Sequence, residues 1–99
     1  MDIETIKSKI LVLYPDTYTS ENIMPLLAKI EHMDPNLRSD LEHFLSTGDI
    51  TTKEVEGYTV EMLMKEHSMN EIAAFLTLDW IIREPQKALK SLQKGHERI

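Results

Sequence analysis

The sequence contains no cysteine, so it can form no disulfide, cysteine-ligated zinc site, iron–sulfur cluster or catalytic thiolate. It also lacks any run of 18 or more apolar residues, which is the signature of a membrane-spanning helix. No basic and then apolar start leads to a small-residue cleavage site, so we predict no secretion signal. These absences favour a soluble protein of the reducing cytoplasm that has no contact with a membrane.

Glycine is scarce, and the three glycines at positions 48, 57 and 95 each stand alone. Loops that bind phosphate need glycines so that backbone N–H groups can approach the anion, and no Walker or dinucleotide motif is present. The GxSxG motif of many hydrolases is also missing. The best-placed hydroxyls stand where helices are expected to begin: Ser20, Thr51, Thr59 and Ser68. We therefore expect no cofactor, no catalytic residue and no enzymatic activity.

Apolar residues recur at spacings of three and four along most of the chain, which is the pattern of amphipathic helices. The first predicted helix, Ile3 to Leu13, has Asp2 as its N-cap. The second begins between Thr19 and Asn22 and ends at Asp34 and Pro35. In the third helix, Asp34 is the N-cap and Pro35 is the first helical residue. Further helices are predicted to begin at Thr59, Ser68 and Pro85, and to end near His67, Glu84 and Gly95.

Residues 49–59 are ambiguous, because their threonine, valine and tyrosine residues also suit a strand. Thr51 and Glu54 have the spacing of a capping box, and Ile50 and Val55 that of a hydrophobic staple. Both signals favour a short helix that ends at Gly57. Ser68 and Glu71 have the same capping-box spacing, which predicts that a new helix begins at Ser68.

The segment from Ile72 to Ile82 contains only two polar residues, Thr77 and Asp79. A helix that is apolar almost all round must be surrounded by other elements. We therefore predict an all-α, compact single-domain bundle over residues 1–99, with about five main helices and one or two short ones around a central apolar helix at about 69–84. Phe75, Leu76 and Trp80 are its expected core residues, and residues 95–99 are expected to form a frayed tail.

Asp79 is the main anomaly of this helix, because an unpaired buried carboxylate is costly. Arg83 lies four residues later on the same side of the helix and is its expected partner. The pair is predicted to be structural, at the edge of the core. The alternative is a polar spot in a pocket or in a subunit interface.

Three Glu-His pairs end at His32, His43 and His67. Adjacent helical residues point about 100° apart, so no single pair chelates a metal, and the HExxH spacing is absent. We expect solvated or capping histidines and no metal site. A site that joins the three histidines in space is the alternative.

The chain carries a formal charge of −6, which is unevenly distributed. Residues 31–71 hold ten acids and three bases, whereas residues 72–99 hold three acids and five bases. Such an acidic middle and basic end can attract each other within one chain or between two. Met62 and Met69 are candidates for a contact surface, because methionine suits adaptable binding sites. Lys87, Lys90 and Lys94 on the last helix are further candidates.

Residues 59–85 read as a short helix, a turn and a longer helix, and this segment is similar to the helix-turn-helix arrangement of small regulators. The resemblance implies nucleic-acid binding through the second helix. That helix is nearly all apolar and the segment is acidic, so we expect no nucleic-acid binding. A basic stripe of Lys87, Lys90, Lys94 and Arg98 is the only basis for that alternative.

The sequence thus predicts a non-enzymatic protein–protein interaction module, whose partner is a second copy of itself or an unknown host protein. A homodimer is the commonest assembly of small proteins. Two alternatives stay open. One is a helix-turn-helix-like regulator that binds nucleic acid. The other is a helical domain that binds a small ligand or acts as an enzyme, with Asp79 or a histidine in the site.

Overall fold

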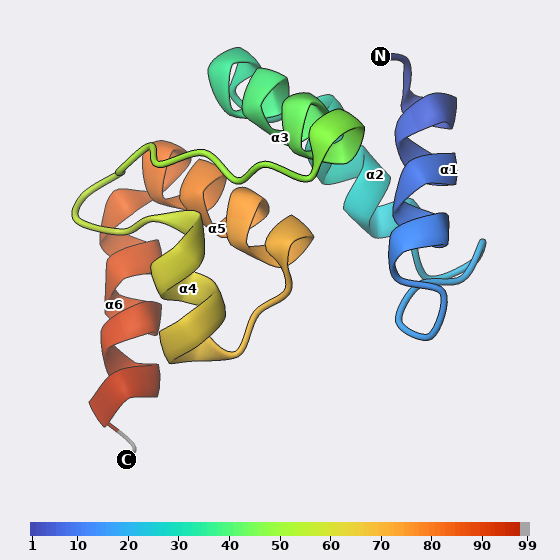
Figure 1. Cartoon of the computed structure of the whole chain (residues 1–99). Coiled ribbons are helices and arrows are strands. Elements are labelled where there is room, and N and C mark those ends of the chain that lie inside the picture. Colours follow the sequence, from blue (N-terminus) through green and yellow to red (C-terminus); the bar gives the residue numbers. More distant parts are fainter. Residues whose placement is uncertain (98–99) are drawn as a thin grey trace. The chain divides into compact units, whose positions relative to one another are not determined.

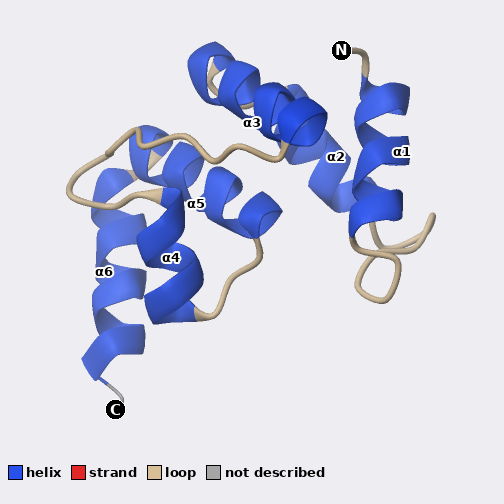
Figure 2. Ribbon diagram, viewed as in Figure 1, coloured by secondary structure: helices blue, strands red, loops and turns tan. Residues whose placement is uncertain are grey.

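The computed structural model describes the backbone of residues 1–97 and the side chains of residues 1–93. Six helices make up its regular structure, and no strand occurs among these described residues (Figure 2). This confirms the predicted all-α class and is consistent with a single-domain helical bundle. The chain divides into two compact units, Met1–Asp49 and Ile50–Ile99.

The first unit contains α1 (Ile3–Leu13), α2 (Met24–Glu31) and α3 (Pro35–Thr47), and α1 packs against both of the others (Figure 1). The predicted caps of α1 and α3 are confirmed. The Asp2 carboxylate accepts a 2.8 Å hydrogen bond from the Thr5 N–H, and Asp34 caps α3. The buried residues of this unit are aliphatic apart from one phenylalanine and one methionine: Ile6, Ile10, Ile23, Leu27, Ile30, Met33, Leu37, Leu41, Phe44 and Leu45.

The second helix begins later than predicted, at Met24 rather than between Thr19 and Asn22. Those two residues cap a turn that precedes the helix. The Thr19 N–H donates to Asn22 Oδ1 at 2.7 Å, and the Asn22 N–H donates to Thr19 Oγ1 at 3.2 Å. Pro25 has no N–H to donate, so it is tolerated only within the first turn of a helix. This accounts for the late start.

The second unit contains α4 (Val60–His67), α5 (Glu71–Arg83) and α6 (Pro85–Glu97). Its central helix is α5, which packs against both α4 and α6. Thr59 caps α4 as predicted, and Pro85 opens α6 as predicted. The predicted end of α6 at Gly95 is wrong, because the helix continues to Glu97. A glycine ends a helix when its backbone turns left-handed, as that of Gly48 does with φ +84°.

The short helix predicted between Thr51 and Gly57 does not form. This segment is irregular, and Val55 and Tyr58 exchange two backbone hydrogen bonds of 2.8 and 2.9 Å across a tight turn. Glu56 and Gly57, at the two central positions, both have positive φ, as a two-residue hairpin turn requires. The Thr51 hydroxyl accepts from the Lys53 N–H, which is a local turn rather than the expected capping box.

The helix break before α5 lies where predicted, but its cap is a different residue. Ser68 ends α4 in the left-handed region, with φ 55° and ψ 35°. Asn70 then caps α5, and its Oδ1 accepts a 2.8 Å hydrogen bond from the Ala73 N–H. The predicted capping box of Ser68 and Glu71 is therefore wrong, because an N-cap needs an extended backbone and Ser68 does not have one.

Candidate protein-binding surface

The central helix α5 has a buried side and a half-buried side. Its buried residues are Ile72, Ala74, Phe75, Leu78, Asp79 and Ile81. A second set, Ala73, Leu76, Thr77 and Trp80, is only half-buried. Spacings of three and four between these residues place them along one stripe of the helix. Part of this apolar stripe therefore stays in contact with water.

Met69 extends the stripe beyond the start of the helix. Its Sδ atom lies 3.3 Å from the Thr77 hydroxyl, which donates its hydrogen bond to the Ala73 carbonyl at 2.8 Å. Met69 is itself half-buried. We call this surface the α5 face and define it by five residues: Met69, Ala73, Leu76, Thr77 and Trp80. The sequence suggests Met69 as a candidate contact residue but does not reveal the stripe to which it belongs.

The expectation that Leu76 and Trp80 are core residues is therefore wrong, whereas Phe75 is fully buried as predicted. Within their unit, α4 and α6 are the helices that pack extensively against α5. Two neighbours do not enclose a helix on all sides. Leu76 and Trp80 therefore keep some apolar surface that the packing of α4 and α6 against α5 does not cover.

Charged residues mark the C-terminal end of the α5 face. Hydrogen bonding from Lys87, and also from Trp80, lowers the pKa of the Glu84 carboxyl, although slight desolvation opposes this shift. The Lys87 Nζ atom lies 3.2 Å from the Glu84 carboxylate. Trp80 is thus the large aromatic residue of the face at the end where these charges lie, and tryptophan is common at protein interfaces.

The Asp79 side chain is fully buried, and Nη2 of Arg83 lies 2.7 Å from its Oδ2 atom. The Arg83 side chain is 49% exposed, so this cation covers the buried carboxylate from the solvent side. An ion pair formed in this way fits the structural interpretation of these two residues, at the edge of the core and beside the α5 face.

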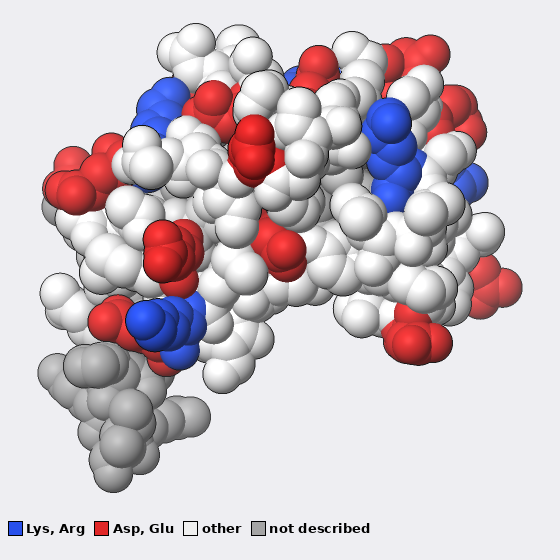
Figure 3. Space-filling view, in the orientation of Figure 1, with Lys and Arg blue, Asp and Glu red and all other residues white. Residues whose placement is uncertain are grey.

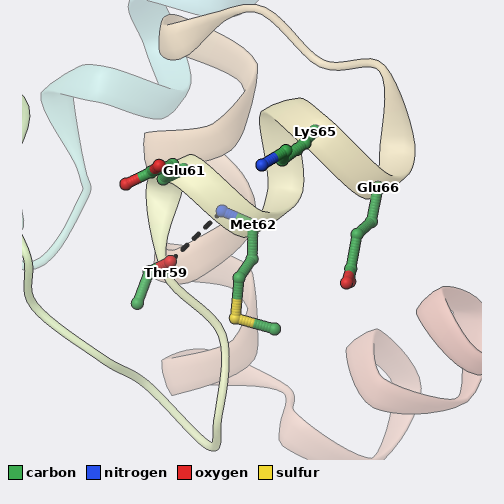
Figure 4. A pocket seen from close by; sticks show the side chains of 5 residues that line it. All are labelled: Thr59, Glu61, Met62, Lys65 and Glu66. Atoms are coloured by element: carbon green, nitrogen blue, oxygen red, sulfur yellow. Dashed lines mark hydrogen bonds between the residues drawn. The ribbon is translucent and has the colours of Figure 1, made fainter.

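Met62, the other predicted contact methionine, is half-buried on the outer side of α4. It lines an open pocket together with Thr59, Glu61, Lys65 and Glu66 (Figure 4). The side chains of Met62 and Glu66 extend in the same direction. The Met62 N–H donates a hydrogen bond to Thr59 Oγ1 at 3.2 Å. All the lining residues come from α4 and its N-cap, so the pocket is a hollow along one side of a single helix.

Lys87 and Lys90 are exposed on α6, as expected for a solvated basic helix. The side chains of Lys94 and Arg98, the other candidates for a basic stripe, lie outside the described residues. On the molecular face drawn in Figure 3, the described basic side chains stand as separate groups among acidic ones. The described part of that face therefore offers no continuous basic patch.

His32 and His43 are exposed in the first unit, and His67 is half-buried in the second. The His43 Nε2 atom lies 4.0 Å from the Asp49 carboxylate, with both side chains largely in solvent. The His67 ring lies 6.3 Å from the Tyr58 ring, measured between centroids. Among the described side chains, no three His, Cys, Asp or Glu residues converge as metal ligands do. The absence of a metal site stays a prediction.

Three exposed apolar residues of the first unit were not identified from the sequence as a surface feature. Val12 and Leu13 end α1, and Met24 begins α2, so the three residues flank one connecting segment. Leu13 had been assigned to the apolar stripe of its helix, but it is exposed.

Among the described helices, none has the length and apolar character needed to cross a bilayer. Comparisons of the chain with protein-family models, with curated protein sequences and with solved structures find no match.

Proposed function

We propose that this chain is a non-enzymatic protein–protein interaction module of the cytoplasm, and that its α5 face is the binding surface. One observation carries the proposal: Leu76 and Trp80 stay half-buried on the central apolar helix of their unit. When a partner covers exposed apolar surface of this kind, the free energy of binding gains about 25 cal/mol for each Å² removed from water. The absence of cysteine supports the cytoplasmic part of the proposal.

The composition of the α5 face also supports this proposal. Tryptophan is among the residues that most often dominate the binding energy of an interface, because it offers a large rigid apolar surface and one N–H donor. Trp80 is the only tryptophan of the chain. The remaining residues of the face are apolar or small, so no charge has to be desolvated on binding.

The nucleic-acid alternative requires a different face. The order of α4, the 68–70 turn and α5 is that of a helix-turn-helix arrangement. However, the five residues of the α5 face include no lysine or arginine. Binding to DNA depends largely on Lys and Arg side chains that neutralise phosphates. The module proposal therefore predicts no gel-shift of duplex DNA at about 150 mM salt.

The test uses two matched charge substitutions on the same helix. Leu76→Glu places a carboxylate in the α5 face. Ile82→Glu places one at a residue that is 42% exposed and lies about 200° around the helix from Trp80. The wild-type chain and both variants, each tagged after residue 99, are purified from the native host. Quantitative mass spectrometry then compares the proteins bound to each, and untagged copies of the chain are counted among them.

We expect a set of bound proteins that Leu76→Glu reduces at least tenfold and that Ile82→Glu leaves unchanged, because a charge buried without a partner costs more than the roughly 1.4 kcal/mol of a tenfold change. Equal recovery with all three proteins would contradict the proposal. So would a DNA shift that Lys87→Glu and Lys90→Glu together abolish.

A further inference from the structure

The α5 face is complementary to itself in size when two copies of α5 run antiparallel. Its largest residue, Trp80, and its smallest, Ala73, lie at equal distances on either side of Leu76 and Thr77. A two-fold axis that passes between Leu76 and Thr77 therefore places each Trp80 opposite an Ala73 of the other copy. Such an isologous arrangement needs a surface patch that fits itself.

The charges at the two ends of α5 are also complementary in this orientation. Glu66, with Lys65 beside it, precedes the turn before α5, and Glu71 follows that turn on the side of the helix away from the α5 face, so this end has a net negative charge. Arg83 and Lys87 lie at the other end of α5 together with Glu84, so that end has a net positive charge. Antiparallel pairing brings Arg83 of one copy to the acidic end of the other. A guanidinium has five N–H donors, so the half-exposed Arg83 can keep Asp79 and still approach a second carboxylate. The helix dipoles also oppose each other favourably in this orientation.

We propose that the partner of the α5 face is a second copy of this chain, bound as a two-fold dimer in which α5 packs antiparallel against α5 with Trp80 opposite Ala73. This inference rests on the proposed function and names its partner. The dimer buries Leu76 and Thr77 at the axis, and the Trp80 indole fills the space above the short Ala73 side chain.

Single cysteines test this geometry cleanly, because the natural chain has none. In Leu76→Cys the two new thiols lie next to the two-fold axis. In Ala73→Cys they lie about 10 Å apart along the helix axis, beyond the Cα separation of about 4–7 Å that a disulfide allows. Ile82→Cys, on the other side of α5, measures random collision. All variants are oxidised with a glutathione buffer and read on non-reducing gels, after circular dichroism has shown that they are folded.

We expect sedimentation equilibrium to show a wild-type dimer whose dissociation constant rises at least tenfold in Leu76→Glu and stays unchanged in Ile82→Glu. Leu76→Cys should cross-link much faster than Ile82→Cys, and Ala73→Cys should not exceed that control. A mixture of Ala73→Cys chains with Trp80→Cys chains should give the mixed disulfide.

Self-linking of Ala73→Cys at the rate of Leu76→Cys would overturn the antiparallel dimer. Cross-linking of all variants at the Ile82→Cys rate would also overturn it. The chain could instead be monomeric at every concentration and bind a host protein, with this binding lost in Leu76→Glu. That result would overturn this inference and leave the proposed function standing. A monomer whose bound proteins are unaffected by Leu76→Glu would contradict both.

Discussion

Arg83 holds the buried Asp79 across one turn of α5, with 2.7 Å between Nη2 and Oδ2. Loss of one partner of such a pair is costly, because the other charge then stays in the protein interior without its counter-ion. Arg83 is half-exposed, so water replaces part of what it provides. We expect Arg83→Met to lower the free energy of unfolding by about 1–3 kcal/mol, as measured by urea denaturation.

The control is Arg83→Lys, which keeps the charge and most of the aliphatic stem but loses the planar guanidinium. It should cost clearly less than Arg83→Met. If the two substitutions are equally harmful, then lost packing rather than lost charge explains the effect, and the role assigned to the ion pair is wrong.

The cap of α5 yields a second prediction, which contrasts two neighbouring residues. Asn70 accepts a hydrogen bond from the Ala73 N–H, whereas Ser68 takes a left-handed backbone at the end of α4. Asn70→Ala should therefore destabilise the protein by about 0.5–2 kcal/mol. Ser68→Ala should change stability by less than about 0.5 kcal/mol, as surface substitutions usually do. Thermal unfolding of both variants checks this, and the reverse order of effects would restore Ser68 as the cap.

Burial along α5 predicts unequal costs of truncation. Phe75 is fully buried, so Phe75→Ala should cost about 3–5 kcal/mol. Leu76 is half-buried, so Leu76→Ala should cost under about 2 kcal/mol when the chain is measured as a monomer at low concentration. Equal losses at the two positions would mean that the α5 face is part of the core, and the binding surface proposed for it would then not exist.

Glu42 yields a prediction about pH. Its carboxylate accepts hydrogen bonds from the Met1 amino group at 3.1 Å and from Arg38 Nε at 3.2 Å. Partial burial acts to raise the pKa of Glu42, but these bonds and charges outweigh it and hold the pKa below its ordinary value. The stabilisation is therefore complete above the ordinary glutamate pKa of about 4.3, and it is lost as pH falls through the lowered value.

Glu42→Gln should accordingly reduce stability at neutral pH by about 1 kcal/mol, and the difference from wild type should shrink in acid below about pH 4. Asp40→Asn, a charge removal on the same helix, is the matched control. Urea denaturation at pH 7 and at about pH 3 measures both. A difference between Glu42→Gln and wild type that does not change with pH would rule out the ion pairs as its cause.

The six helices that form were all expected from the sequence, but one further predicted helix, at residues 51–57, does not form, and several helix ends differ from the prediction. Asp34 and Pro35 suit the N-cap and the first position of a helix, and α3 begins there. The spacing of Thr51 and Glu54 fits a capping box equally well, yet the chain turns at Glu56 and Gly57 instead. A capping box is a local pattern of four residues, and the hairpin-like contact of Val55 with Tyr58 outweighs it.

The α5 face was harder to predict for a different reason. Helical periodicity separates polar from apolar sides, but α5 is apolar on nearly all sides, so no contrast marks the half-buried stripe. Leu76 and Trp80 therefore read as core residues. The Asp79–Arg83 contact was easier to anticipate, because residues four apart on a helix are neighbours whatever surrounds them.

The most direct test of the central claim is the fluorescence of Trp80, which reports on the α5 face alone because the chain has no other tryptophan. On association through this face the half-buried indole loses its contact with water. We predict that dilution shifts the wild-type emission to longer wavelength and increases quenching by acrylamide. Ile82→Glu should behave like wild type, and Leu76→Glu should show the exposed values at every concentration. Emission and quenching that are independent of dilution, and unchanged by every protein that co-purifies with the chain, would contradict the claim that this face binds a protein.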